Sequence, residues 1–227
     1  MIVIKNAALR KAIQIASPIT VVVVVALGAL VFDEKLYAYI SLAVTILALI
    51  FFISGFERKK TGTRRLIIVA VMVTLSVVGR FIPFFKPITA LTVITAIYLG
   101  SESGFLVGAL AAVISNFYFG QGPWTPFQML AWGLIGLVAG LLAQPLKKSR
   151  VLLCAYGAIS GIAFSFIMDI WTVLWYNNSF DITLYLSALT TAIPYTVMYS
   201  VSNIIFLWLL AKPFGNKLER VKIKYGV

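Results

Sequence analysis

Long apolar runs, separated by short polar or basic segments, make up most of the chain. They lie at about residues 15–32, 36–55, 66–84, 87–100, 103–119, 127–145, 151–176 and 183–211. A helix that spans a membrane needs roughly 17–25 mostly apolar residues. Only Ser101-Glu102-Ser103 separates the fourth and fifth runs, and Gly100 and Gly104 flank it, which favours a tight turn between two helices. The pattern therefore predicts eight spanning helices, with Glu102 solvated in the turn.

The composition is that of an integral membrane protein. Of the residues, 61% are hydrophobic and 11% are charged, and the mean hydropathy is +1.01. Soluble domains are nearer half apolar and carry about a quarter charged residues. We therefore predict an all-α integral membrane protein, a polytopic helical bundle. The net charge of +12 does not favour nucleic-acid binding, because the positive residues cluster at the ends of the apolar runs.

The distribution of Lys and Arg predicts the topology, because cytoplasmic loops of membrane proteins are enriched in both. With eight spans and the N-terminus inside, most of the 19 Lys and Arg residues fall on the inside. Those that fall outside are Lys35, Arg80 and Lys86. Merging the fourth and fifth runs would put the later loops on the wrong side. We therefore expect a multi-pass protein of the cytoplasmic membrane, with both termini in the cytoplasm.

Several kinds of chemistry are missing from the sequence. The chain has no His and one Cys, Cys154, so it lacks the usual metal ligand and a disulfide framework. It contains no phosphate-binding loop, no nucleophile elbow and no paired carboxylates. We therefore predict that the protein is not an enzyme and holds no metal or catalytic cofactor. No clear inverted repeat relates its halves, which weakens a secondary-transporter interpretation.

Small residues recur at a spacing of four, which lets helix backbones approach closely in a membrane. The rows are Gly100, Gly104, Gly108 and Ala112; Gly136 and Gly140; and Gly157, Gly161 and Ser165. We interpret these rows as internal packing faces of a compact bundle. The third predicted helix follows a basic loop and carries another face of small residues, with Ala70 and Thr74. This face is a candidate surface for a partner.

The polar residues that do not signal topology gather on the predicted outer face, in the segments 79–88, 119–128 and 175–182. All three combine aromatic side chains with amides or Pro and few charges. The middle segment reads FGQGPWTPFQ, and its Gly and Pro residues favour a non-helical backbone at a cavity or outside the hydrocarbon. Ligand pockets commonly combine apolar walls with a few polar groups. We therefore predict the rim of a ligand pocket here, with Trp124 as an interfacial anchor the alternative.

Asp169 lies inside the seventh predicted span, about two turns from its outer end. A charge within the hydrocarbon costs several kcal/mol, so such residues usually face a cavity or a partner. One interpretation places Asp169 at the floor of the outer pocket, near Trp171 and Trp175. The other gives it a hydrogen bond inside the bundle, with Ser165 or Tyr195 as candidate partners.

Three parts of the sequence carry a resemblance to a known family. They are VTLSVVGRFIPFF (73–85), the run from Pro87 to Leu142, and the basic break after it. Within that run, SNFYFGQGPWTPFQMLAWGLIG (115–136) is the most specific block. The chain resembles the substrate-binding S components of energy-coupling factor (ECF) vitamin transporters, most of all the cobalamin type. The resemblance covers about residues 66–211 and implies a six-helix core at 61–227. Residues 1–60 look like an addition of two helices.

The resemblance implies a function. Such a subunit binds its vitamin tightly at the outer face, then associates with a membrane scaffold (T) subunit and two ATPases, which use the ATP. Members dock on the scaffold with an A-x-x-x-A pattern on the first core helix, which here corresponds to Ala70 and Thr74, with Thr in place of the second Ala. The expected ligand is cobalamin or a related corrinoid, with Arg80 or Lys86 near its phosphate. With no His in the chain, we expect its cobalt ligation to stay unchanged.

The predicted outer face supplies most of the candidate substrate-binding residues. They are Arg80, Phe84, Phe85, Lys86, Asn116, Gln121, Trp124, Thr125, Gln128, Asp169, Trp171, Trp175, Asn177 and Tyr195. Three alternatives stay open: an S component for another vitamin or precursor, a stand-alone proton-coupled carrier that uses Asp169, and a structural subunit without a ligand.

Overall fold

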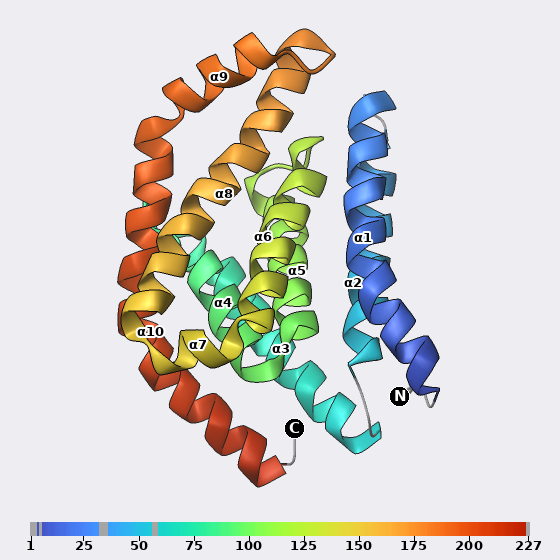
Figure 1. The fold of residues 1–227 in the computed structure, drawn as a ribbon, viewed down its shortest axis with the longest axis vertical. Helices are drawn as coiled ribbons and strands as arrows, with labels where there is room; N and C mark the ends of the chain where they lie inside the picture. The colour runs from blue at the N-terminus through green and yellow to red at the C-terminus, as the bar shows by residue number, and fades with distance from the viewer. Residues whose placement is uncertain (1–3, 5, 32–35, 56–58, 226–227) are drawn as a thin grey trace.

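The computed structural model describes residues 4, 6–31, 36–55 and 59–225, and every regular element in them is a helix (Figure 1). The helices are α1 (Ala7–Val31), α2 (Tyr37–Ser54), α3 (Lys59–Gly79), α4 (Ile88–Leu99), α5 (Ser101–Phe119), α6 (Trp124–Leu141), α7 (Ala143–Lys148), α8 (Arg150–Asn177), α9 (Ile182–Thr191) and α10 (Ile193–Tyr225). Six of these are long and apolar enough to cross a membrane: α1, α2, α5, α6, α8 and α10.

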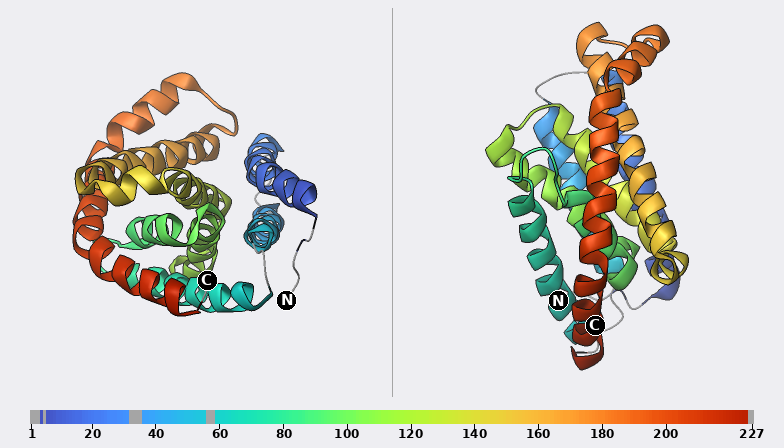
Figure 2. Two further views of the ribbon diagram at one scale, coloured as in Figure 1. Left: turned by 60° about the horizontal axis from the view of Figure 1, so that its bottom comes forward. Right: turned by 90° about the vertical axis from the view of Figure 1, so that its left-hand side faces the viewer.

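The helices surround α4, which is short and buried along almost its whole length. It packs against α3, α5, α6 and α10. The α1–α2 hairpin lies on the far side of α5 and α6 from α10, as Figure 2 shows from below. The two ends of the described chain lie at the bottom of Figure 1, and the α8–α9 turn lies at the top. We call the top the outer end, following the charge-based prediction.

Close packing of α5 against α6 forms the centre of the bundle. A Cβ atom added at Gly136 would lie 2.5 Å from the backbone carbonyl of Gly104, and one added at Gly108 would lie 2.4 Å from the carbonyl oxygen of Trp132. Gly140 meets the backbone of Ser101 in the same way. The glycine rows are therefore internal packing faces, as the spacing predicts. On α8, an added Cβ at Gly161 would lie 2.6 Å from the backbone nitrogen of Ser200 on α10, and one at Gly157 would lie 2.6 Å from the side chain of Leu207.

The predicted tight turn at Gly100 is confirmed, but the prediction that Glu102 is solvated is wrong. Gly100 has φ of 99°, a left-handed conformation that favours glycine, and it separates α4 from α5. Glu102 is 17% exposed and accepts a 2.8 Å hydrogen bond from Arg65 on α3, rather than being solvated. Arg65 also donates to Ser103 at 2.8 Å. This ion pair ties the start of α3 to the start of α5.

The last predicted span, 183–211, is not one helix. It divides into α9 and α10 at Ala192, and α10 continues to Tyr225. Pro194 lies in the first turn of α10. Because proline has no backbone N–H to donate to a carbonyl of α9, the helix of α9 does not continue through it. No residue of α9 is buried. The predicted arrangement of eight spans with both termini inside remains a prediction.

The segment FGQGPWTPFQ is less irregular than its composition suggests. Only residues 120–123 lie outside helices, because α6 already begins at Trp124. Pro126 sits in the first turn of α6, where a proline costs no intrahelical hydrogen bond. Thr125 and Gln128 are therefore helical residues, which places their side chains on a rigid element.

Replacing Gly136 with Ala tests the central contact. The new methyl group would meet the backbone of α5, which can yield only if the helices separate, and overpacking of this kind costs about 1–3 kcal/mol. We expect a lower midpoint of thermal unfolding in detergent. Gly133→Ala is the matched control on α6, since its Cβ would approach only ring atoms of Phe105, at 3.0 Å. Equal midpoints for both variants would contradict the proposed role of the α5–α6 contact.

Candidate functional site

Arg80 is the centre of a polar cluster at the outer end. It follows α3 directly, and its Nη1 donates hydrogen bonds to Ser115 Oγ at 2.5 Å and Asn116 Oδ1 at 2.6 Å. Its guanidinium lies 4.9 Å from the ring centroid of Phe119 and 5.6 Å from that of Trp132. Cation–π contacts at such distances stabilise a cation most where water is excluded. Arg80 thereby links the end of α3 to α5 and α6.

Asn116 extends this cluster from α5 to α6. Its side chain is fully buried, and its Nδ2 donates to Thr125 Oγ1 at 2.8 Å and Gln128 Oε1 at 2.9 Å. Thr125 donates in turn to Gln121 Oε1 at 3.1 Å, and Gln121 donates to the carbonyl of Val113 at 2.8 Å. The cluster is therefore a connected hydrogen-bond network that runs from Arg80 through Asn116 to Thr125, Gln128 and Gln121.

An aromatic cavity adjoins this cluster on the side of α8 and α10. It measures about 30 Å³, and its lining is Lys86, Ile88, Thr89, Trp132, Gly161, Phe164, Tyr199, Ser202 and Asn203. The rings of Trp132 and Phe164 stack with centroids 4.6 Å apart, and Tyr199 meets Phe164 edge-on at 5.3 Å. Trp132 donates its indole N–H to Thr89 Oγ1 at 3.1 Å. Four helices therefore supply aromatic walls and neutral hydrogen-bonding groups.

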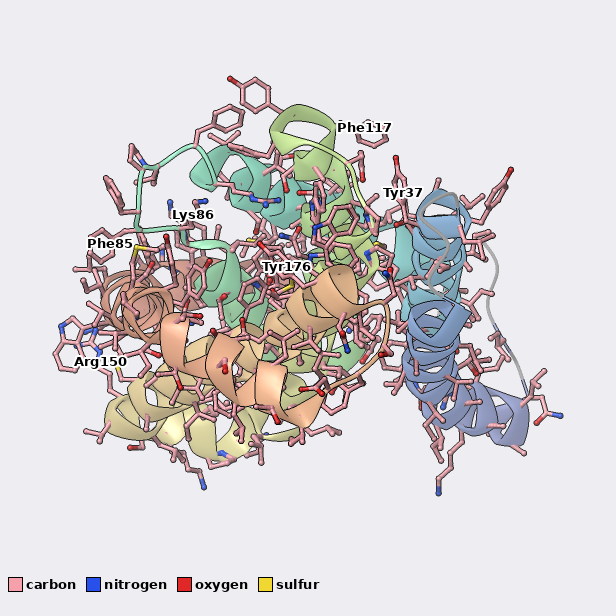
Figure 3. All side chains as sticks on the ribbon, turned by 90° about the horizontal axis from the view of Figure 1, so that it is seen from above. Tyr37, Phe85, Lys86, Phe117, Arg150 and Tyr176 are labelled. Atoms are coloured by element: carbon pink, nitrogen blue, oxygen red, sulfur yellow. The ribbon has the colours of Figure 1, made fainter. Side chains whose placement is uncertain are left out.

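The loop between α3 and α4, residues 80–87, covers one side of this cavity. Phe84 has φ of 61° and is 72% exposed, an uncommon left-handed conformation for a bulky residue. The Lys86 ammonium lies 5.8 Å from the Phe119 ring, and Ser202 on α10 donates to the Lys86 carbonyl at 3.3 Å. Burial lowers the pKa of Lys86, and repulsion from Arg80 lowers it further. Figure 3, viewed from the outer end, shows Lys86 and Phe85 on this loop.

A second aromatic group joins α6 to α8. Trp171 is 9% exposed, and its ring lies 6.2 Å from Trp124, 6.0 Å from Phe127 and 5.4 Å from Trp175. Trp124 also lies over Gly122, where an added Cβ would come within 2.3 Å of its ring. Trp124 is thus packed against the protein by both its own loop and α8.

The structure brings together some of the predicted site residues and leaves others apart. Arg80, Asn116, Gln121, Thr125 and Gln128 form one network, and Lys86 lies beside it. The described contacts of Asn177 are with Ser179 in its own turn, and Tyr195 is 61% exposed on α10. Phe85 is 39% exposed and Trp175 43% exposed.

Asp169 is 8% exposed, and its Oδ2 atom is buried without a hydrogen-bond partner among the described residues. Ser165, one turn earlier on α8, interacts with the same carboxyl group. Ser165 also accepts a 2.6 Å hydrogen bond from Thr196 on α10. Of the two partners expected for Asp169, the described contacts therefore include Ser165.

The residues that line the cavity were not predicted, apart from Lys86. Thr89, Trp132, Phe164, Tyr199 and Asn203 all lie within predicted spans rather than in the outer loops. Polar residues inside apolar runs, such as Thr89 and Asn203, were the signal available. Trp132 lies within the segment 115–136 that carries the family resemblance.

The small face of α3, predicted as a candidate partner surface, is exposed in the structure. Ala70 and Thr74 are exposed, and Thr74 donates to the carbonyl of Ala70 at 2.9 Å within its own helix. Ile67, Val71 and Val78 are exposed on the same helix by 61%, 52% and 60%. The opposite face of α3, with Val69, Met72, Val73 and Ser76, is buried against the bundle. α3 is therefore packed on one face only.

Comparison with known proteins identifies a family for most of the chain. Residues 59–220, from α3 into α10, match the family model described as ECF-type riboflavin transporter, S component. The α1–α2 hairpin lies outside the matched residues. No curated protein and no solved structure matches the chain.

Replacing Asn116 with Ala tests whether the polar cluster holds α3, α5 and α6 together. The change leaves Arg80, Thr125 and Gln128 short of a partner in a buried site, and each such loss costs about 1–3 kcal/mol. We expect a clearly lower thermal midpoint in detergent. Asn177→Ala, the same change at an exposed amide, is the control and should leave the midpoint unchanged. A vitamin-affinity loss without any stability loss would assign Asn116 to the ligand instead.

Proposed function

Because the chain belongs to the family of ECF-type riboflavin transporter S components, we propose that it is the vitamin-binding membrane subunit of an ATP-driven importer. S components are substrate-binding subunits of transporters rather than enzymes. The observation that carries the proposal is the family match over residues 59–220, which include every residue of the polar cluster and the aromatic cavity. The hydrolysis of ATP falls to partner subunits.

Riboflavin is the first candidate ligand. Its flat, largely neutral ring system suits aromatic walls such as Trp132, Phe164 and Tyr199, because aromatic rings stack favourably. Its ribityl hydroxyls suit the neutral polar groups of Thr89, Ser202 and Asn203. The cavity, about 30 Å³, is far smaller than the roughly 300–1,000 Å³ of typical ligand pockets. The proposal therefore requires the 80–87 loop to move outward, and the strained backbone at Phe84 supports a loop that rearranges.

Cobalamin is the second candidate, favoured by the composition of the outer segments. Buried neutral amides beside Arg80 and Lys86 suit a ligand that carries many primary amides and one phosphodiester. A ligand of that size would require a wider opening, between the 80–87 loop and the outer ends of α6 and α8. In Figure 3 Tyr176, at the outer end of α8, lies near the middle of this face.

The proposed transport cycle uses two separate surfaces. The ligand binds at the outer end, and the exposed face of α3 around Ala70 and Thr74 docks on the scaffold (T) subunit, which carries two ATPases. Apolar side chains flank the small residues on this face, as expected for helix association in a membrane. The orientation with both termini in the cytoplasm follows from the distribution of positive charge.

The hairpin of α1 and α2 is proposed to be an added unit, residues 1–60, on a core of residues 61–227. It packs on α5 and α6 through contacts such as that of Phe51 with Phe105, whose ring centroids are 5.6 Å apart. Tyr37 and Phe117 line a groove of about 450 Å³ between α2 and α5, and Figure 3 shows both at this junction. The hairpin therefore covers the core along α5 and α6, whereas the aromatic cavity opens on the side of α8 and α10.

The ligand is identified by purifying the protein from cells grown with both vitamins and analysing what it releases on denaturation. We expect riboflavin, and a one-to-one titration of the ligand-free protein by calorimetry. Phe164→Leu should weaken binding roughly fivefold, about 1 kcal/mol, because it removes a stacking ring from the cavity. Phe127→Leu is the matched control, a buried ring of the other aromatic group, and should bind as the native protein does. Release of cobalamin alone would replace riboflavin, and binding of neither vitamin would refute the proposal.

Docking on the scaffold is tested by Ala70→Trp. The large side chain would block close helix approach on the exposed face of α3, so we expect normal ligand affinity but little uptake in cells that contain the complete transporter. Ile159→Trp is the matched control, since Ile159 is 61% exposed on α8, and this variant should keep normal uptake. Loss of ligand binding in Ala70→Trp would show that this face serves internal packing instead.

A further inference from the structure

A basic pocket lies at the end of the bundle opposite Arg80. It measures about 340 Å³, and its lining is Ile97, Tyr98, Leu146, Lys147, Lys148, Arg150, Leu153, Ala211, Lys212 and Asn216. Figure 1 shows α7 lying across this end, between α6 and α8, with α10 passing beside it. Four cations from α7, α8 and α10 thus share one cavity, far from the proposed vitamin site.

Two of the four cations are positioned by aromatic rings. Lys147 Nζ lies 4.5 Å from the ring centroid of Tyr98, and the Arg150 guanidinium lies 4.5 Å from that of Trp208. Arg150 also donates to the carbonyl of Trp208 at 3.3 Å. Arg150 lies at the edge of the bundle in Figure 3. These contacts restrict the long side chains without neutralising their charge.

Among the residues that the structure describes, the four cations of the pocket have no ion-pair partner. In the part of the chain that the structure describes, Arg65–Glu102 is the ion pair within 4 Å, and it lies at another site. Burial lowers the pKa of Lys147 and repulsion from Lys222 adds to this, while Glu219 acts in the opposite direction. The surplus of positive charge makes an anion the complementary ligand.

The rest of the lining is apolar. Ile97, Leu146, Leu153 and Ala211 share the cavity with the cations, at the level where α8 begins and α10 leaves its apolar part. A small soluble anion would make no contact with these apolar side chains. An anionic phospholipid would, because its phosphate is joined to glycerol and acyl chains. Basic pockets between membrane helices are known to suit anionic headgroups.

We propose that this pocket binds the phosphate of an anionic phospholipid headgroup. Lys147, Lys148, Arg150 and Lys212 surround the phosphate oxygens, and the apolar residues contact the first carbons of the glycerol and acyl chains. A bound lipid would join α7, α8 and α10, and so stabilise the arrangement of the helices at this end. The proposal does not depend on which vitamin the protein binds.

Native mass spectrometry of the full chain in detergent measures this binding. Phosphatidylglycerol, phosphatidylcholine and inorganic phosphate are titrated separately at about 0.15 M ionic strength, where the screening length is about 8 Å. We expect a one-to-one complex with phosphatidylglycerol and much weaker binding of phosphatidylcholine. K147Q/K212Q should weaken phosphatidylglycerol binding roughly tenfold or more, at about 1 kcal/mol for each lysine removed. K148Q/K212Q is a second variant with the same expectation.

The matched control is K217Q/R220Q, which removes two exposed positive charges of α10 that do not line the pocket. It should retain native affinity within about twofold, because distant charges are screened at this ionic strength. Equal losses in the control and pocket variants would overturn the proposal in favour of diffuse attraction. Binding of inorganic phosphate as tight as that of phosphatidylglycerol would overturn the lipid as the source of the phosphate.

Discussion

Backbone contact between α5 and α6 is the constraint on which the rest of the structure depends. Gly104, Gly108 and Gly136 have no side chains that would hold the two helices apart. This close approach places Asn116 of α5 within hydrogen-bond reach of Thr125 and Gln128 of α6. In lipid, where apolar burial from water does not drive helix association, such close packing takes over that role.

The polar cluster and the aromatic cavity depend on that contact in different ways. Arg80 reaches α5 from the end of α3, and its cation–π contacts with Phe119 and Trp132 require both helices to be in place. Trp132 belongs to both sites, because its ring contacts Arg80 of the cluster and stacks on Phe164 of the cavity. The cluster's hydrogen bonds hold α3, α5 and α6 together, and the cavity beside it is the ligand site that we propose for riboflavin.

The two ends of the molecule differ in how they handle charge. At the outer end, Arg80 is partly buried, and its Nη1 donates to Ser115 and Asn116. At the opposite end, Lys147, Lys148, Arg150 and Lys212 line one cavity without a carboxylate within 4 Å in the described residues. A bundle with this asymmetry is suited to a largely neutral ligand on one side and to anionic headgroups on the other.

The sequence by itself determined the class of the protein, the turn at Gly100 and the packing role of the glycine rows, because hydropathy, spacing and backbone freedom are local properties. It also singled out Arg80, Asn116, Gln121, Thr125 and Gln128, since polar groups at a membrane boundary are conspicuous. Only the tertiary structure decided that these residues satisfy one another, that Glu102 pairs with Arg65, and that Trp132, Phe164 and Tyr199 form one cavity. Those facts depend on which helix faces meet, and residues as far apart as Thr89 and Asn203 are brought together by packing rather than by any local pattern.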